Sequence, residues 1–339
     1  MSTLTEAAPA QATAPVAVEL TYREAINAAL EDEMASDPTV VLLGEDVDAD
    51  GGVFKTNIGL PDKFPGRVLP TPICENGFMG VALGMSITGM RPVVEIMFAD
   101  FLPTAGDAIV NQLPKYRYMS GGQFTVPVTV RISSGGGAGF GTQHSATAES
   151  WYMAQPGMRI VTASSPQAAY ELLRAAIRNN DPVLFFEHKV LYTRKGPVER
   201  GVISDIGTAR VLREGTDVTI VATLLMVEKS LAAAEALDAE GISAEVIDLR
   251  WIRPLDHATV EASVRKTGRL VIAEEQWHEG GWGATLISKL AQTRIPWKAS
   301  PTAVSLPYDL LIPYSPTLEA ELLPSADKIA AAARTAVGR

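Results

Sequence analysis

The chain has 339 residues, of which 47% are hydrophobic and 20% are charged, a composition typical of a globular protein with room for two domains. Its formal net charge is -10 and it contains no block of Lys or Arg, so nucleic acid is not an expected partner. The single cysteine, Cys74, cannot form an intrachain disulfide or a multi-thiolate metal site. This favours a reducing compartment, and the cytoplasm is the expected location.

Two segments bear on whether the chain enters a membrane or is exported. The most apolar stretch, Gly77–Met90, has 14 residues. A membrane-spanning helix needs about 20, so this stretch predicts a buried helix instead. Residues 1–18 are rich in Ala, Thr and Pro, but they lack the basic start and apolar core of a secretory signal. We expect a disordered arm there and no association with a membrane.

The first part of the chain alternates helix and strand patterns. Tyr22–Met34 has apolar residues at helical spacing, with Thr21 as the predicted N-cap and Glu24 three residues later. Short apolar runs, typical of strands buried in a parallel sheet, recur along the chain, and Ser165–Arg178 has a helical period. Residues 19–195 are therefore predicted to form a doubly wound α/β domain. The predicted strands are Val40–Gly44, Pro92–Met97, Val126–Ile132, Met158–Thr162 and Pro182–Glu187.

A second α/β pattern follows a polar stretch. Thr193–Ile206 contains turn residues and few apolar side chains, so we place a linker at residues 196–208. Residues 209–339 again alternate strand and helix, which predicts a smaller α/β domain. Its expected strands are Val218–Ala222, Ala244–Asp248 and Arg269–Glu274, and its expected helices are Val227–Glu240, Ala258–Lys266, Gly281–Gln292 and Ser325–Ala336.

Turn glycines stand beside polar groups where predicted strands end, which is the edge where open α/β sheets bind ligands. The acidic residues after Gly44 are consistent with a solvated loop or with a ligand site. Glu75 stands where a helix begins. From spacing alone, a carboxylate that stabilises the helix start is favoured over one held in a dry pocket with a raised pKa. Gly80 and Gly84, four residues apart, predict a helix face that another helix or subunit approaches closely.

A glycine-rich segment, Ser133–Gly141, precedes His144. Five glycines in nine residues resemble a phosphate-binding loop, but no Lys-Ser or Lys-Thr follows and the spacing is not that of a Walker motif. A mobile loop that brings His144 to a cleft is the better interpretation, although a single histidine is more often structural. No histidine pair has zinc-ligand spacing, and no Ser-His-Asp arrangement stands out.

Together these segments resemble a known family from Leu20 to the C-terminus. The chain is similar to the beta subunit of the decarboxylating first component of pyruvate, branched-chain 2-oxo acid and acetoin dehydrogenase complexes. The matching segments are Gly-Glu-Asp-Val at 44–47, Gly-Gly-Val-Phe at 51–54, Thr-Pro-Ile-Cys-Glu-Asn-Gly-Phe at 71–78, Arg-Pro-Val at 91–93, Tyr-Met-Ser-Gly-Gly at 118–122, Gln-His-Ser at 143–145, Glu-His-Lys at 187–189, Val-Ile-Asp-Leu-Arg at 246–250 and Pro-Leu-Asp at 254–256.

The resemblance implies a pyrimidine-binding domain joined to a transketolase C-terminal-like domain, with thiamin diphosphate as cofactor. The cofactor glutamate of the family falls on Glu75. Hydrogen-bonded to the pyrimidine nitrogen N1′, a carboxylate there favours the imino tautomer that removes the thiazolium proton, which overturns the preference for a helix-start role. The resemblance places Phe101 and Ile73 among the cofactor-binding residues. It places His144 in proton handling or acyl transfer to lipoamide.

Part of the expected cofactor site is missing from the chain. The Gly-Asp-Gly motif that normally begins the magnesium and diphosphate site is interrupted at Gly106-Asp107-Ala108. An alpha-type subunit is therefore expected to hold Mg2+ and the diphosphate in an α2β2 heterotetramer, and a lipoyl acyltransferase core is expected to receive the acyl group. The family also implies a structural potassium ion bound by backbone oxygens of Val128, Ala176, Ile177, Asn179 and Asp181.

The expected activity is that of an acetyl-transferring pyruvate dehydrogenase or acetoin dehydrogenase, favoured over the branched-chain type by Glu187-His188-Lys189. Pro70, Ala146 and Thr285 depart from the family pattern and leave the substrate open. One alternative is a split transketolase, which needs basic residues for a sugar phosphate. Another is a non-catalytic assembly module, against which the retention of the site residues argues.

Overall fold

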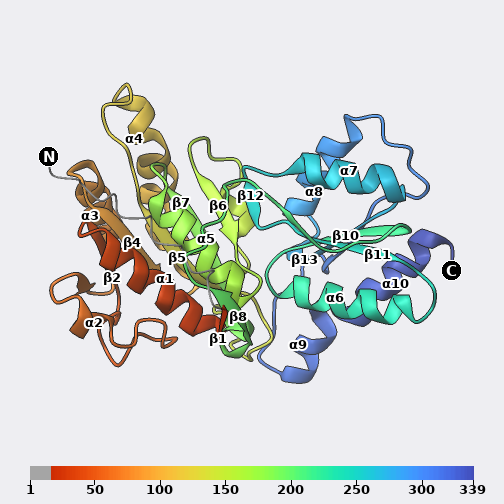
Figure 1. Ribbon diagram of the computed structural model, residues 1–339, viewed down its shortest axis with the longest axis horizontal. Helices are drawn as coiled ribbons and strands as arrows, with labels where there is room; N and C mark the ends of the chain where they lie inside the picture. Colours follow the sequence, from red (N-terminus) through yellow and green to blue (C-terminus); the bar gives the residue numbers. More distant parts are fainter. Residues whose placement is uncertain (1–16) are drawn as a thin grey trace, which may run out of the picture.

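The computed structural model describes residues 17–339, which form one α/β unit around a seven-stranded sheet and another around a five-stranded sheet. The expected fold class is confirmed. The two sheets lie side by side along the long axis of the molecule, and the C-terminus lies at the far end of the second unit (Figure 1). Residues 1–16 of the predicted arm lie outside the described residues, whereas Ala17 and Val18 belong to a strand.

The first sheet has the strand order β12-β6-β7-β5-β4-β2-β3, and β12 is its antiparallel member. Every residue of β2, β5 and β7 is buried, because helices cover both faces. The five predicted strands are confirmed. The strands are β2 (Val40–Gly44), β3 (Val68–Pro70), β4 (Arg91–Ile96), β5 (Thr129–Ser134), β6 (Arg159–Thr162), β7 (Val183–His188) and β12 (Trp251–Arg253).

Helices α1 (Tyr22–Ser36) and α5 (Pro166–Arg178) pack together on one face of this sheet (Figure 1). The predicted capping box of Thr21 and Glu24 is present at the start of α1. The opposite face is covered by α3 and by short helices after β4. The remaining helical segments of this unit are α2 (Leu60–Lys63), η1 (Ala99–Ala105), the π-helical η2 (Ala108–Gln112), α4 (Leu113–Met119), η3 (Glu149–Tyr152) and η4 (Lys189–Thr193).

The apolar segment predicted to be a buried helix forms α3 (Glu75–Ile87), but only one of its faces is buried. Phe78 and Met79 pack into the core, whereas Val81 is 55% exposed. The predicted burial therefore holds for one face only, because an apolar run does not distinguish a face that meets the chain's own core from a face left for a partner.

The predicted linker contains regular structure. Strands β1 (Ala17–Thr21) and β8 (Lys195–Glu199) form a two-stranded antiparallel sheet, in which Val198 is fully buried. The polar composition of this stretch concealed the strand, because a two-stranded ribbon at the surface needs few apolar residues.

The second sheet has the order β14-β13-β10-β11-β9, parallel except for β9. Helices α6 and α10 cover one face, and α7 and α8 cover the other (Figure 1). All predicted strands and helices of this unit are confirmed, while β9, β14 and α9 were not predicted. The elements are β9 (Arg210–Arg213), β10 (Val218–Ala222), α6 (Leu225–Asp238), β11 (Ala244–Asp248), α7 (His257–Thr267), β13 (Leu270–Trp277), α8 (Trp282–Ala291), β14 (Thr302–Leu306), α9 (Pro316–Leu322) and α10 (Ala326–Val337).

The two units are joined across the predicted boundary. Strand β12 comes from the second half of the sequence but pairs with β6 of the first sheet, and its Trp251 is fully buried. Each of the two large apolar clusters contains residues of both units. Domain limits at residues 195 and 209 stay a prediction. Within the described part of the chain, no helix is both long and apolar enough to span a bilayer.

Candidate active site

The carboxyl ends of β2, β3, β4, β5 and β7 lie at one edge of the first sheet, because these strands are parallel. The segments that carry Glu75, Phe101 and His144 all leave the sheet at this edge, where open α/β sheets bind ligands. The residues predicted to bind potassium lie at the opposite edge, around the starts of β5 and β7. The sheet therefore separates the predicted chemistry from the predicted potassium site.

An aromatic cluster surrounds His144. Its imidazole meets the ring of Phe98 edge-to-face with the centroids 4.7 Å apart, and the ring of Phe101 with the centroids 5.5 Å apart. Phe98 and Phe101 also contact each other edge-to-face at 5.6 Å. Such aromatic pairs are favourable and fix the orientation of the rings. The structure thus brings two of the predicted site residues together and adds Phe98, which is 8% exposed.

Glu75 is the first residue of α3 and is half-buried. Helix α3 packs against η1, which carries Phe101, so Glu75 joins the same group of elements. Burial, with a contribution from the nearby Glu75 carboxylate, raises the pKa of Glu45. One carboxylate oxygen of Glu45 is buried without a hydrogen-bond donor among residues 17–339. Unsatisfied carboxylate oxygens at a ligand-binding edge fit a polar ligand group. Ile73, the other residue predicted to bind the cofactor, lies two residues before α3 and is 84% exposed.

The segment that carries His144 is anchored on both sides of that residue. The Thr142 hydroxyl donates to the carbonyl oxygen of Ile312 at 3.0 Å, and the amide of Ala146 donates to the Asp100 carboxylate at 3.1 Å. These groups, which the sequence does not show, tie the segment to other elements, and the mobility of the loop stays a prediction.

Comparison with known proteins agrees with this arrangement. The transketolase pyrimidine-binding domain family matches residues 18–195, and the transketolase C-terminal domain family matches residues 207–329. The pyruvate dehydrogenase E1 component subunit beta-2, mitochondrial, of Oryza sativa subsp. japonica is 44% identical, over 100% of this chain and 92% of the relative. The chain belongs to the E1 beta-subunit family.

Other relatives agree with this assignment. The subunit beta of acetoin:2,6-dichlorophenolindophenol oxidoreductase of Cupriavidus necator is 41% identical over 94% of this chain and 98% of its own length. The E1 beta subunit of pyruvate dehydrogenase of Staphylococcus aureus (strain Mu50) is 39% identical over 88% and 92%. A solved structure described as a split gene transketolase, inactive beta4 tetramer, has 26% identity and a TM-score of 0.77, over 94% of this chain and 98% of that one. The resemblance found in the sequence is confirmed, and the chain is the beta subunit of a 2-oxo acid dehydrogenase.

Lys189 is a buried polar residue beside the aromatic cluster that the sequence did not single out. Its ammonium lies 5.5 Å from the centroid of the Phe98 ring, and the residue is 7% exposed. Burial lowers the pKa of Lys189 to about 8, while the nearby carboxylates of Asp100 and Glu275 act in the opposite direction. The resemblance had included Lys189 only in a motif, and Phe98 carried no signal beyond its place two residues after the end of β4.

A buried carboxyl group behind the loop joins the two units of the E1 beta chain. Glu149 is 2% exposed, accepts a hydrogen bond from the Ser134 hydroxyl at 3.3 Å, and accepts another from the Gln276 amide. Burial raises the pKa of Glu149 from 4.5 to about 7, and the nearby carboxylate of Glu275 adds to the effect. The folded chain therefore binds this proton more tightly than the unfolded chain does.

The raised pKa of Glu149 predicts a loss of stability as the pH rises. The stabilisation is complete below the unfolded pKa of 4.5 and is lost as the pH passes through about 7. The total change is about 3 kcal/mol. The thermal midpoint of the wild type should therefore fall between pH 5.5 and pH 8. The midpoint of Glu149→Gln should fall by less over the same range. Thermal denaturation at the two pH values measures this difference, and equal changes in both proteins would contradict the prediction.

Four of the five backbone oxygens predicted to bind potassium accept hydrogen bonds within the chain. The Arg91 guanidinium donates to the carbonyl oxygens of Ile177 and Asn179, at 3.2 and 3.1 Å. The carbonyls of Val128 and Ala176 accept backbone N–H groups. The Arg91 cation therefore contacts two of the five predicted ligands, and a potassium ion stays a prediction. Among residues 17–339, no group of three or more His, Cys, Asp and Glu side chains could hold a metal ion.

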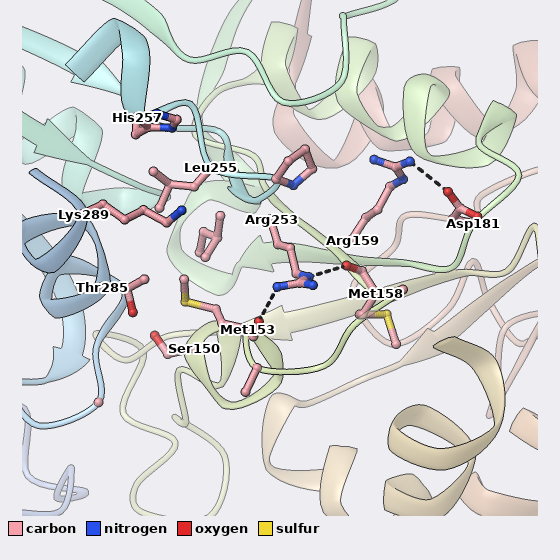
Figure 2. A pocket seen from close by; sticks show the side chains of 15 residues that line it. Ser150, Met153, Met158, Arg159, Asp181, Arg253, Leu255, His257, Thr285 and Lys289 are labelled. Atoms are coloured by element: carbon pink, nitrogen blue, oxygen red, sulfur yellow. Dashed lines mark hydrogen bonds and ion pairs between the residues drawn. The ribbon is translucent and has the colours of Figure 1, made fainter. Parts of the chain in front are cut away.

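A pocket of about 740 Å3 lies between the two units (Figure 2). Neither Glu75 nor His144 lines it. Arg253 donates to the carbonyl oxygens of Met158 and Met153, at 3.0 and 2.8 Å, and Arg159 pairs with Asp181 at 2.8 Å. Two of its arginines thus bind groups of the chain itself. This pocket therefore does not include the predicted catalytic residues.

Proposed function

We propose that this beta subunit pairs with an alpha-type subunit and forms with it a thiamin diphosphate site that decarboxylates pyruvate or cleaves acetoin and passes the acyl group to a lipoyl group. The observation that carries the proposal is the cluster of Phe98, Phe101 and His144 at the carboxyl edge of the sheet, beside the helix that begins at Glu75. The relatives named for pyruvate and acetoin dehydrogenases support both substrates.

Each site residue has a physical role in this proposal. When bound, thiamin diphosphate supplies a nucleophilic carbon and an electron sink. Glu75 holds a proton at pyrimidine atom N1′, for which a half-buried carboxylate is suited. Phe101 offers an aromatic surface to the pyrimidine ring. His144, with its ring held by Phe98 and Phe101, donates or accepts a proton during acyl transfer.

The exposed face of α3 has the features of an interface with another subunit. A Cβ atom added at Gly80 or Gly84 would meet no atom of the described chain within 4 Å, so these glycines do not serve internal packing. Val81, between them, is 55% exposed, and Ile73 is 84% exposed. Exposed apolar residues beside small residues are typical of protein interfaces. We therefore assign this face, next to Glu75, to the alpha-type subunit in an α2β2 heterotetramer.

The proposal assigns Mg2+ and the diphosphate to that partner, because Gly106-Asp107-Ala108 lacks the glycine of the usual motif. It includes a lipoyl acyltransferase core as acceptor of the acyl group. Classification as an acetyl-transferring pyruvate dehydrogenase is part of the same proposal. Cytoplasmic location stays a prediction, because relatives include proteins named as mitochondrial.

The test is an acyl-transfer assay with the chain co-expressed with its alpha-type subunit. Pyruvate, a branched-chain 2-oxo acid and acetoin are offered with a lipoylated domain as acceptor, and acylation is followed by mass spectrometry. We expect acylation with pyruvate or acetoin. Transfer between sugar phosphates without lipoyl acylation would instead support the split transketolase alternative. No turnover of any substrate would favour the assembly module.

A further inference from the structure

The loop that leads to His144 is held by two carboxylates of the C-terminal unit. The backbone N–H of Gly136 donates to Glu275 of β13 at 2.5 Å. The N–H groups of Gly137 and Gly139 donate to the two carboxylate oxygens of Glu319 in α9, at 2.7 and 3.1 Å. Three charge-assisted hydrogen bonds therefore join the loop of the first unit to carboxylates of the second unit.

The hydrogen bonds to Glu319 explain why this loop contains glycines. Gly137 and Gly139 have φ values of +86° and +73°, which side-chain-bearing residues rarely adopt. Alternating conformations of this kind turn backbone N–H groups toward one anion. A Cβ at Gly136 would lie 3.3 Å from Oε1 of Glu319 and 3.2 Å from the Leu323 side chain. The loop thus has the form of an anion-binding loop, and its anion is Glu319 rather than a phosphate.

Glu319 is bound tightly to one position of the loop. It is 3% exposed, so its carboxylate cannot be well solvated by water. If the loop moved away, the carboxylate would lose both of these donors. The Glu319 side chain therefore stabilises the loop conformation seen here over other conformations.

Residues 312–319, which include Glu319, also contact the part of the loop next to His144. The Tyr314 ring occupies the space above Gly141, where an added Cβ would lie 2.4 Å from it. The Thr142 hydroxyl donates to Ile312 at 3.0 Å, and the His144 amide donates to the Gly141 carbonyl at 3.4 Å. Contacts with residues 312–319 thus extend along the loop from the glycines to the turn that carries His144.

We propose that Glu319 is a positioning residue for His144. It fixes the glycine-rich loop so that the imidazole stays against Phe98 and Phe101, and it acts only through the loop. This inference rests on the proposed role of His144 in acyl transfer and adds the residue that holds His144 in place.

The experiment uses Glu319→Gln in the complex assembled with the alpha-type subunit. The amide group cannot accept from both N–H groups, because one of its ends is itself a donor. We expect hydrogen–deuterium exchange of residues 135–147 to become about tenfold faster, because the loop opens more often. Glu321→Gln, on the exposed side of α9, is the matched control and leaves this exchange unchanged. Unchanged loop exchange in Glu319→Gln would overturn the inference.

Acyl transfer provides the second readout. We expect Glu319→Gln to slow lipoyl acylation by about 10- to 100-fold, because a small displacement of a reacting group has an effect of this size. The thiamin diphosphate Kd should stay as in the wild type. His144→Ala should also slow acylation without changing this Kd, and Glu319→Gln should cause no further loss in the His144→Ala background. An equal further loss in that background would overturn the inference.

Two additional outcomes separate this inference from the proposed function. A wild-type acylation rate in His144→Ala would contradict the proposed role of His144, and Glu319 could then not act by positioning it. The exchange data would still show whether Glu319 holds the loop. If Glu319→Gln does not assemble, Thr142→Val removes the bond to Ile312 and should accelerate loop exchange and slow acylation in the same direction. Wild-type values for both in Thr142→Val would overturn the inference.

Discussion

Replacing Glu75 by glutamine is expected to lower turnover of the assembled complex by about 10³-fold or more, because glutamine cannot hold or move the proton at N1′. Glutamine has nearly the same size, and the N-cap residue of α3, Cys74, makes no side-chain cap that depends on it. Loss of the carboxylate at the helix start costs about 0.3–1 kcal/mol, so α3 and the heterotetramer should remain intact. Steady-state assays and size-exclusion chromatography measure the two effects.

Asp327→Asn is the matched control for this substitution. Asp327 is also an acidic residue in the first turn of a helix, α10, in the second unit. Removing its charge has the same small effect on a helix start and should leave turnover unchanged. Wild-type turnover in Glu75→Gln would remove Glu75 from the catalytic residues.

The second large effect is expected at Arg131, at the centre of the first sheet. Its guanidinium binds Glu187 at 2.7 and 3.1 Å and Glu95 at 2.8 Å, and all three residues are at least 94% buried. Burial alone would lower the pKa of Arg131, but the two carboxylates raise it above its ordinary value. The arginine therefore balances two buried negative charges across β4, β5 and β7.

Arg131→Met should destabilise the chain by about 3–5 kcal/mol, because it leaves two buried carboxylates without a cation. The loss should be larger at pH 8 than at pH 5.5, because burial raises the pKa of Glu187 and its carboxylate takes up a proton more readily at the lower pH. Arg194→Met, which breaks an exposed pair with Glu228, should cost at most about 1 kcal/mol. Thermal denaturation compares the two variants, and equal midpoints would contradict the prediction.

The sheet strands of both units could be predicted because their physical signal is local. Val40–Gly44 is buried on both faces, so it is a continuous apolar run ended by a glycine. The start of helix α1 could be predicted from Thr21 and Glu24, because the capping box that they form involves only residues three apart in the sequence. By contrast, β8 and β12 exist through pairing with distant strands, and their own sequences carry little strand pattern.

The site was only partly predictable for the same reason. Glu75 and His144 stand in recognisable motifs, and the loop glycines were visible. The partners that orient the loop lie far away in the sequence, such as Glu319, 182 residues from Gly137. No local pattern distinguishes a buried carboxylate of this kind from a solvated one. Spacing alone favoured a helix-start role for Glu75, and only the whole set of motifs changed that interpretation.

The most direct test of the account is calorimetric titration of thiamin diphosphate with Mg2+ into the chain alone and into the complex with its alpha-type subunit. The account predicts no binding by the chain alone and saturable binding by the complex, because each subunit supplies part of one site. Tight binding by the chain alone, or no binding by either sample, would contradict it.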